Sequence, residues 1–259
     1  MKSKAIKLNP ILSGNCIEQM KNLKPKSFQL IVTDPPYNIS GKSKLDLKNN
    51  TTGGPWYKME ESWDVFKDYK DYLNFSKLWI TEADKLLKDT GSMMICCSYH
   101  GLSEIMMVLK ELDYKILNII IWKKTNPMPN VTKRTLTHST EFVVWAAKTK
   151  GWTFDYTEMK KYNDGKQLRD VWEFPLCQGP ERIKNSENRA AHPNQKPISL
   201  ITRLIEMATK KGDSVLDPFL GTATVAIVAN NLKRKWVGIE NNPEYIKIAK
   251  KRIKSKENL

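Results

Sequence analysis

The stretch SVLDPFLGTA, residues 214–223, decides the fold class of this chain. Its apolar start predicts a short buried strand, and Gly221 predicts a tight turn after that strand. Small and apolar residues at 224–232 predict a helix, and the run 236–239 predicts a second strand that ends at Glu240. A strand, a helix and a strand in this order predict two parallel strands joined by a crossover helix.

The same alternation extends over the first 147 residues. Helices are predicted at 16–23, 72–87 and 102–112, and strands at 30–32, 92–98, 116–122 and 141–147. This order is typical of an α/β protein with a mostly parallel, twisted sheet and helices on both faces. From about residue 148 to 191 the alternation is lost. Aromatic residues are interleaved there with lysines and arginines, which suits a nucleic-acid surface or an irregular subdomain with its own small core.

The charge balance favours a polyanionic partner. The chain has 259 residues, with 43 Lys and Arg against 28 Asp and Glu, so its formal net charge is +15. Nucleic acid is the first candidate partner and an acidic membrane surface the second, although a solvated lysine-rich surface gives the same balance. The longest apolar run, 119–122, is far too short to span a bilayer. We therefore expect a cytoplasmic protein that does not enter a membrane.

The four cysteines and three histidines are scattered, without a CxxC pair or a regular spacing. This pattern predicts neither a metal site nor a disulfide framework, and it fits a reducing cytosol. Cys96 and Cys97 lie inside an apolar run and are predicted to be core residues.

A second informative stretch is LIVTDPPY, residues 30–37. The two prolines stop the predicted strand, because proline fixes φ and lacks an N–H group. Asp34 and Tyr37 are thereby held at the carboxyl end of a strand, where open α/β sheets place their ligand crevices. A plain strand-ending turn would account for the same residues. In the stretch 214–223, a turn glycine such as Gly221 allows a ligand to approach the backbone. An acid at the end of the next strand, such as Glu240, accepts hydrogen bonds from ribose hydroxyls in nucleotide-binding sheets.

Three separated motifs resemble those of the amino-methylating DNA methyltransferases. Residues 34–37 resemble their D-P-P-Y motif, and residues 217–221 resemble their cofactor motif, D-P-F-x-G-x-G. Residues 192–197, HPNQKP, resemble the H-P-x-Q-K-P segment that precedes the cofactor motif. The order of the motifs is similar to that of the β group of this family. The resemblance spans nearly the whole chain.

The resemblance implies a Rossmann-like methyltransferase fold that uses S-adenosylmethionine. It also implies one domain, 1–259, in permuted motif order. The catalytic part is then 1–147, an inserted target-recognition region is about 148–191, and the cofactor-binding part is 192–259. Relatives in the β group are often homodimers, and their usual setting is a restriction–modification pair with a companion restriction endonuclease.

The resemblance also assigns roles to single residues. Asp34 and the carbonyl of Pro35 would accept the two N–H groups of the target amine, and Tyr37 would stack on a base that has left the duplex. Seven residues are implied in cofactor binding: Asp217, Phe219, Leu220, Gly221, Thr222, Glu240 and Lys196. Lys196 or Thr222 is the candidate for the methionine carboxylate, with a solvated surface lysine as the alternative for Lys196. The chain departs from the family motif at Ala223, where a glycine usually stands.

Double-stranded DNA is the expected partner. Its candidate contacts are Lys123, Lys124, Lys133 and Arg134, in a predicted basic loop at 123–137, and Lys166, Arg169 and Arg182 in the target-recognition region. A long polar segment at 38–63 is the candidate for a lid over a bound group.

The most specific hypothesis is methylation of N6 of adenine in duplex DNA, because relatives that act on N4 of cytosine more often carry Ser in place of Asp34. N4 of cytosine is the alternative. A DNA-binding protein that senses the cofactor without catalysis is less compatible with an intact Asp34. Amino methylation of protein or RNA is less compatible too, because it typically shows Asn there. The Pro-Cys dipeptide of the cytosine-C5 enzymes is absent.

Overall fold

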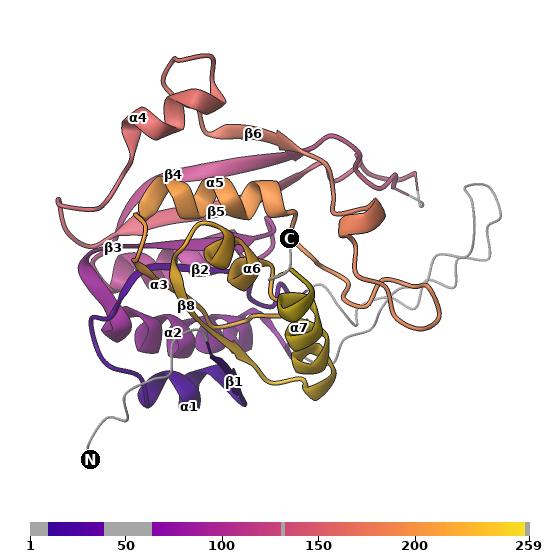
Figure 1. Ribbon diagram of the computed structural model, residues 1–259, viewed down its shortest axis with the longest axis horizontal. Helices are drawn as coiled ribbons and strands as arrows, with labels where there is room; N and C mark the ends of the chain where they lie inside the picture. The colour runs from indigo at the N-terminus through magenta and orange to yellow at the C-terminus, as the bar shows by residue number, and fades with distance from the viewer. Residues whose placement is uncertain (1–9, 39–63, 131–132, 257–259) are drawn as a thin grey trace.

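The computed structural model describes residues 10–38, 64–130 and 133–256, and these residues form a three-layer α/β fold (Figure 1). Its central layer is an eight-stranded sheet with the order β1-β8-β7-β2-β3-β5-β4-β6. The strands are β1 (Ile11–Ser13), β2 (Phe28–Thr33), β3 (Leu87–Cys97), β4 (Lys115–Lys124), β5 (Thr140–Ala147), β6 (Val171–Phe174), β7 (Ser214–Asp217) and β8 (Lys235–Glu240). Only β5 runs antiparallel to its neighbours, β3 and β4. The predicted mostly parallel sheet is confirmed.

Helices cover both faces of the sheet, as predicted. One face carries α1 (Cys16–Lys21), α2 (Tyr69–Leu86) and α3 (Leu102–Glu111). The other carries α4 (Tyr156–Met159), α5 (Ile198–Ala208), α6 (Thr224–Asn231) and α7 (Pro243–Lys256). In Figure 1, α1 and α2 lie on one side of the sheet and α4 and α5 on the other.

The two faces have separate hydrophobic cores, and β2 contributes to both. Leu30 and Val32 belong to the core under α5 and α6, whereas Ile31 belongs to the core under α2 and α3. Successive side chains of a strand point to opposite faces, so a strand that is covered on both sides is apolar throughout. All six residues of β2 are buried. The apolar run before Asp34 therefore places that carboxylate at the end of a central, rigid strand.

The predicted helices and strands are present, with ends shifted by up to five residues. α2 begins at Tyr69, three residues before the predicted start, because the Asp68 carboxylate caps it by accepting the Asp71 N–H at 2.9 Å. Its end leads directly into β3. Gly91 is required early in that strand, where a Cβ atom would stand 2.9 Å from the carbonyl oxygen of Gln29.

One expectation about the basic regions is wrong, and a second holds only in part. Lys123 and Lys124 are the last residues of β4 and do not belong to a loop. The region 148–191 is not irregular throughout, because β6 pairs parallel to β4 and extends the main sheet. Trp172 and Phe174 of β6 are buried and the residues between and before them are exposed. This alternation spans only four residues, too few to stand out among the other aromatic residues of the region.

Within the described ranges, no helix is long and apolar enough to cross a membrane. The predicted lid at 38–63 lies outside the described residues, except for Asn38.

Candidate active site

A cavity of about 720 Å³ opens at the carboxyl edge of the parallel strands. Its walls come from the ends of β2, β7 and β8, from the start of α1, and from the segment before α5. The main lining segments are 14–16, 33–37, 192–196, 217–222 and 239–243. Ligands of open α/β sheets bind at this edge. Three sequence motifs that lie far apart along the chain therefore share one cavity.

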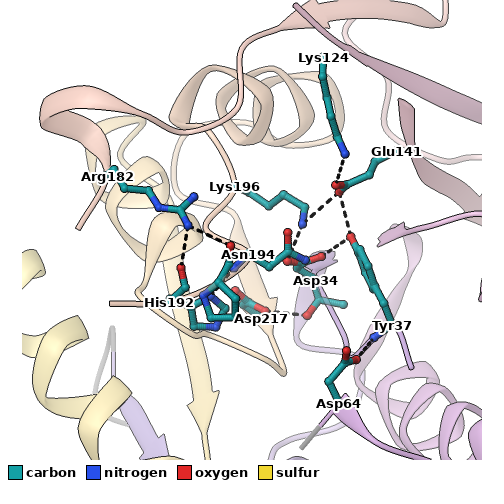
Figure 2. A network of polar contacts seen from close by, with 12 residues as sticks. Asp34, Tyr37, Asp64, Lys124, Glu141, Arg182, His192, Asn194, Lys196 and Asp217 are labelled. Atoms are coloured by element: carbon teal, nitrogen blue, oxygen red, sulfur yellow. Dashed lines mark hydrogen bonds and ion pairs between the residues drawn. The ribbon is translucent and has the colours of Figure 1, made fainter. Parts of the chain in front are cut away.

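The Asp34 carboxylate is held at both oxygens (Figure 2). Oδ1 accepts the hydroxyl of Tyr37 at 2.5 Å, and Oδ2 accepts the ammonium of Lys196 at 2.7 Å. Burial raises the pKa of Asp34 most strongly, the Lys196 charge lowers it, and the nearby carboxylate of Glu141 raises it again. The net pKa lies above the ordinary value, so this carboxylate depends on Lys196 for its charge.

Lys196 is buried in the site, so the alternative of a solvated surface lysine is wrong. Its side chain is only 4% exposed, and its Nζ lies 3.3 Å from the Glu141 carboxylate as well as against Asp34. Burial acts to lower the pKa of Lys196, but the carboxylates of Asp34 and Glu141 raise it above the ordinary value. Lys196 is therefore a charged residue whose partners are carboxylates. Its contact with the methionine carboxylate stays a prediction.

Glu240 and Gly221 also line the cavity. Glu240 Oε2 accepts the N–H of Gly221 at 2.8 Å, and its Oε1 accepts the N–H groups of Asn241 and Asn242. Gly221 has a φ of +51°, and a Cβ there would stand 3.3 Å from Nε2 of His192. The absence of a side chain at Gly221 thus permits this positive φ and leaves room for the His192 ring.

The substitution at Ala223 does not abolish the turn. Ala223 is fully buried and adopts the left-handed conformation, with φ 67° and ψ 33°, at the start of α6. Alanine adopts this conformation at an energetic cost that glycine does not have. The backbone of the cofactor motif is therefore kept in this chain with Ala in place of Gly.

The model of the DNA methylase family, whose name specifies N6 and N4 methyltransferases, matches residues 28–251. The chain belongs to this family of N6/N4 DNA methylases. It is 41% identical over 249 residues to the type II methyltransferase M.HinfI of Haemophilus influenzae, covering 95% of this chain and 68% of that protein. It is 38% identical to the type II methyltransferase M2.LlaDCHI of Lactococcus lactis subsp. cremoris, covering 94% of this chain and 88% of that protein.

Solved structures agree with this membership. A crystal structure of M1.HpyAVI in complex with S-adenosylmethionine superposes with a TM-score of 0.67 at 30% identity, covering 94% of this DNA methylase and 98% of the other chain. The cytosine-N4-specific PvuII DNA methyltransferase superposes with a TM-score of 0.72 at 19% identity, covering 95% and 90%. At 19% identity, the likeness to the PvuII enzyme shows only that the two proteins share a Rossmann-like fold. Members of this family depend on S-adenosylmethionine.

The remaining predicted cofactor residues shape the cavity wall. Asp217 is buried, which raises its pKa to about 7, and it accepts the Thr33 hydroxyl at 2.7 Å and the Phe219 N–H at 3.1 Å. The Phe219 ring packs edge-on against Trp79 at 5.3 Å. Leu220 is buried over Gly238, where a Cβ would stand 2.5 Å from its side chain. These residues therefore give the turn its form through contacts within the protein.

Arg252 of α7 is a residue of the site that the sequence did not indicate. Its buried guanidinium donates to the Thr222 carbonyl and to the Thr224 hydroxyl, both at 2.9 Å, and to the Thr222 hydroxyl at 3.3 Å. Burial lowers the pKa of Arg252 from its ordinary value. Arg252 therefore holds the cofactor turn, residues 218–223 between β7 and α6, from the side of α7. Nothing in the local sequence of this amphipathic helix indicates that role.

Glu141 and Asp64 were also not indicated by the sequence. Glu141, near the start of β5, contacts Lys124, Lys196 and Tyr37. Asp64 Oδ1 accepts the backbone N–H groups of Tyr37 and Asn38 at 2.5 and 2.8 Å, which fixes the exit from the D-P-P-Y turn (Figure 2). Each contact joins residues far apart along the chain, so no spacing rule could have found it.

The candidate DNA-binding residues fall into two groups. The side chains of Lys133, Arg134, Lys166 and Arg169 are exposed, and Lys123 is half-exposed in an ion pair with Glu173. Lys124 and Arg182 are engaged within the protein. Lys124 pairs with Glu141 at 2.9 Å, and Arg182 donates to the carbonyls of Cys177, His192 and Pro193. All seven DNA contacts stay predictions.

Among the described residues, no group of three or more His, Cys, Asp or Glu side chains is arranged to hold a metal ion.

Proposed function

We propose that this DNA methylase transfers a methyl group from S-adenosylmethionine to N6 of adenine in duplex DNA. The observation that carries the proposal is the shared cavity. It brings the Asp34 carboxylate, held by Lys196, to the same space as Gly221 and Glu240. A carboxylate that could accept amine N–H bonds and a turn that could bind a nucleoside thereby line one cavity.

The residues present fit S-adenosylmethionine. Gly221 lines the cavity without a side chain, and the Glu240 carboxylate, on the adjoining strand end, lines the cavity where ribose hydroxyls could donate to it. Phe219 and Phe75 also line the cavity, with ring centroids 5.9 Å apart, and offer apolar surface to an adenine ring. Bound S-adenosylmethionine supplies an electrophilic methyl group on a sulfonium centre.

The protein's own contribution is to prepare the target amine. The exocyclic nitrogen of adenine is a poor nucleophile, because its lone pair is delocalised into the ring. The Asp34 carboxylate and the Pro35 carbonyl would accept its two N–H bonds and turn the lone pair toward the methyl group. Such positioning and fixed charge supply most of the rate in a reaction without a covalent enzyme intermediate.

Tyr37 defines the side of the target pocket. Its ring is buried, and its hydroxyl is tied to Asp34 and, at 3.3 Å, to Glu141. A base can reach this depth only after it has rotated out of the duplex. We infer that the Tyr37 ring contacts the face of that base.

The test is methyl transfer followed by nucleoside analysis. The purified protein is incubated with labelled S-adenosylmethionine and unmethylated duplex DNA, and the digested DNA is analysed by mass spectrometry. N6-methyladenine is the expected product. N4-methylcytosine would replace the adenine assignment by the cytosine alternative, and the absence of any methylated nucleoside would reject the proposal.

The partner in this proposal is double-stranded DNA, and the setting is a restriction–modification system, as the two type II relatives suggest. A companion restriction endonuclease and a homodimer stay predictions.

A further inference from the structure

We propose that Glu141 is a positioning residue for methyl transfer, which acts on Asp34 through Lys196 and Tyr37. This inference rests on the proposed function. Glu141 lies outside the three motifs and does not line the cavity. Its effect on the reaction would be transmitted by the side chains of Lys196 and Tyr37, each of which contacts the carboxylates of both Glu141 and Asp34.

The sheet topology explains how Glu141 reaches the site. Glu141 is opposite Trp122 in the antiparallel register of β4 and β5, and both lie on the face of the sheet that α5 covers. Lys196 belongs to the segment that leads into α5, so it reaches the same face. Lys124, two residues after Trp122, points to that face as well.

Glu141 is joined to Asp34 by two bridges of a single side chain each (Figure 2). Its Oε2 lies 3.3 Å from Nζ of Lys196 and 3.3 Å from the hydroxyl of Tyr37. The same ammonium lies 2.7 Å from Asp34 Oδ2, and the same hydroxyl lies 2.5 Å from Asp34 Oδ1. Glu141 therefore fixes both groups that hold the two oxygens of Asp34.

Lys124 completes the cluster and balances its charge. It lies 2.9 Å from Glu141 Oε1, and both side chains are 12% exposed. The cluster then contains two carboxylates and two ammonium groups, which offsets much of the cost of burying each charge alone. Burial raises the pKa of Glu141, but Lys196 and Lys124 together lower it below the ordinary value. The two ammonium groups therefore favour the ionised form of Glu141.

Other titratable groups face this cluster, and most of them are uncharged at neutral pH. The thiols of Cys96 and Cys97 on β3 approach from the sheet, and burial raises their pKa values far above the ordinary range. The same holds for the Tyr37 hydroxyl. Asp217 on β7 interacts with Asp34 at longer range, and its own pKa is raised by burial. The charge on Asp34 is therefore governed chiefly by burial, Lys196 and Glu141.

Lys196 and Glu141 act on Asp34 in opposite directions, which gives the proposal a distinctive signature. The charge of Lys196 favours ionised Asp34, and the charge of Glu141 disfavours it. A glutamine at either position removes one charge and keeps much of the volume. A residue that only stabilised the fold would not shift the pH dependence of the chemical step.

The experiment measures the single-turnover rate of methyl transfer to duplex DNA, at saturating cofactor and DNA, from acidic to neutral pH. Glu141→Gln is expected to move the acid limb of the profile to lower pH, and Lys196→Gln to higher pH. Glu141→Ala, which removes both hydrogen-bond bridges, is expected to lower the rate at neutral pH by about 10²-fold. Glu141→Gln should recover most of that loss, because its amide oxygen still accepts from Lys196 and Tyr37.

A matched control is Glu111→Gln. Glu111 also pairs with a lysine, Lys77, but the pair is about half exposed and lies on helices α2 and α3, away from the cavity. This variant should leave the profile unchanged. In Glu141→Gln the Kd of S-adenosylmethionine should stay close to the wild-type value, since Glu141 does not line the cavity and the glutamine still accepts from Lys196.

An acid limb that stays in place in Glu141→Gln, in an active protein, would overturn the inference and leave the proposed function intact. If Glu141→Ala fails to fold, the shift of the acid limb in Glu141→Gln is by itself the test of the inference. A wild-type protein without methyl transfer to DNA would reject the proposed function and this inference with it.

Discussion

Replacement of Arg252 by methionine tests how the cofactor turn is held. Methionine keeps an apolar stem of similar length in α7 and removes the guanidinium. The carbonyl of Thr222 and the hydroxyl of Thr224 would lose their donors inside the protein. We expect the folded state to be less stable and the turn around Gly221 to be less ordered.

The size of the effect follows from the two short hydrogen bonds. Each bond from a charged donor contributes about 1.5–3 kcal/mol, so the pair contributes about 3–6 kcal/mol. The variant also relieves the cost of burying the guanidinium, which is visible in the lowered pKa of Arg252. We therefore expect the free energy of unfolding to fall by about 3 kcal/mol, at the lower end of that range. For a domain of this size the melting temperature would fall by roughly 6–12 °C.

The assay is thermal and urea unfolding of the protein without cofactor, together with calorimetric titration of S-adenosylmethionine. We expect about half of the lost energy to appear as weaker binding, which is about a tenfold rise in Kd. Lys251→Met, on the exposed side of the same helix, is the control and should change stability by less than about 0.5 kcal/mol. Equal stability of the Arg252 and Lys251 variants would refute the reasoning.

Three further predictions concern the cavity and the DNA surface. Burial, with the charges of Lys196 and Arg182, lowers the pKa of His192 to about 3. The folded state then binds fewer protons than the unfolded chain, whose histidine has a pKa of about 6.5. Stability is therefore lost as pH falls below that value, by about 2 kcal/mol between about pH 7 and pH 5. In urea unfolding at both pH values, the wild type should lose about 2 kcal/mol more stability than His192→Gln between about pH 7 and pH 5. Equal losses in the two proteins would contradict the prediction. DNA affinity should fall steeply with salt, and Lys133→Ala with Arg134→Ala should reduce the slope of log K against log salt by about two in fluorescence anisotropy. A DNA affinity that does not change with salt would mean that the exposed lysines and arginines do not bind DNA phosphates. Glu240→Ala should weaken S-adenosylmethionine binding in calorimetry, and an unchanged affinity would remove the ribose assignment.

Much of the fold could be predicted because the strands carry strong local signals. The buried run of β2 and the strand, turn and helix at 214–231 are continuous apolar segments bounded by proline or glycine. α5 was not predicted, although its apolar residues at 201, 204, 205 and 208 recur at helical spacing. β6 has only four residues, and its place beside β4 is set by long-range packing. A local pattern cannot report that.

The site residues likewise include some that could be predicted from the sequence and some that could not. Asp34, Gly221 and Glu240 each follow a predicted strand, so their place at the carboxyl edge could be inferred from the sequence. Lys196 was identified only by resemblance, and its partner, Asp34, could not be inferred. Glu141 follows no turn signal and belongs to no motif. Its importance depends on the register between β4 and β5, which only the folded structure shows.

The most direct test of the central claim is a paired measurement on Asp34→Ala. Calorimetry measures binding of S-adenosylmethionine, and mass spectrometry of digested duplex DNA measures N6-methyladenine. If Asp34 prepares the target amine, the variant keeps its cofactor affinity and loses methyl transfer by about 10³-fold or more. Wild-type formation of N6-methyladenine by Asp34→Ala would contradict the account.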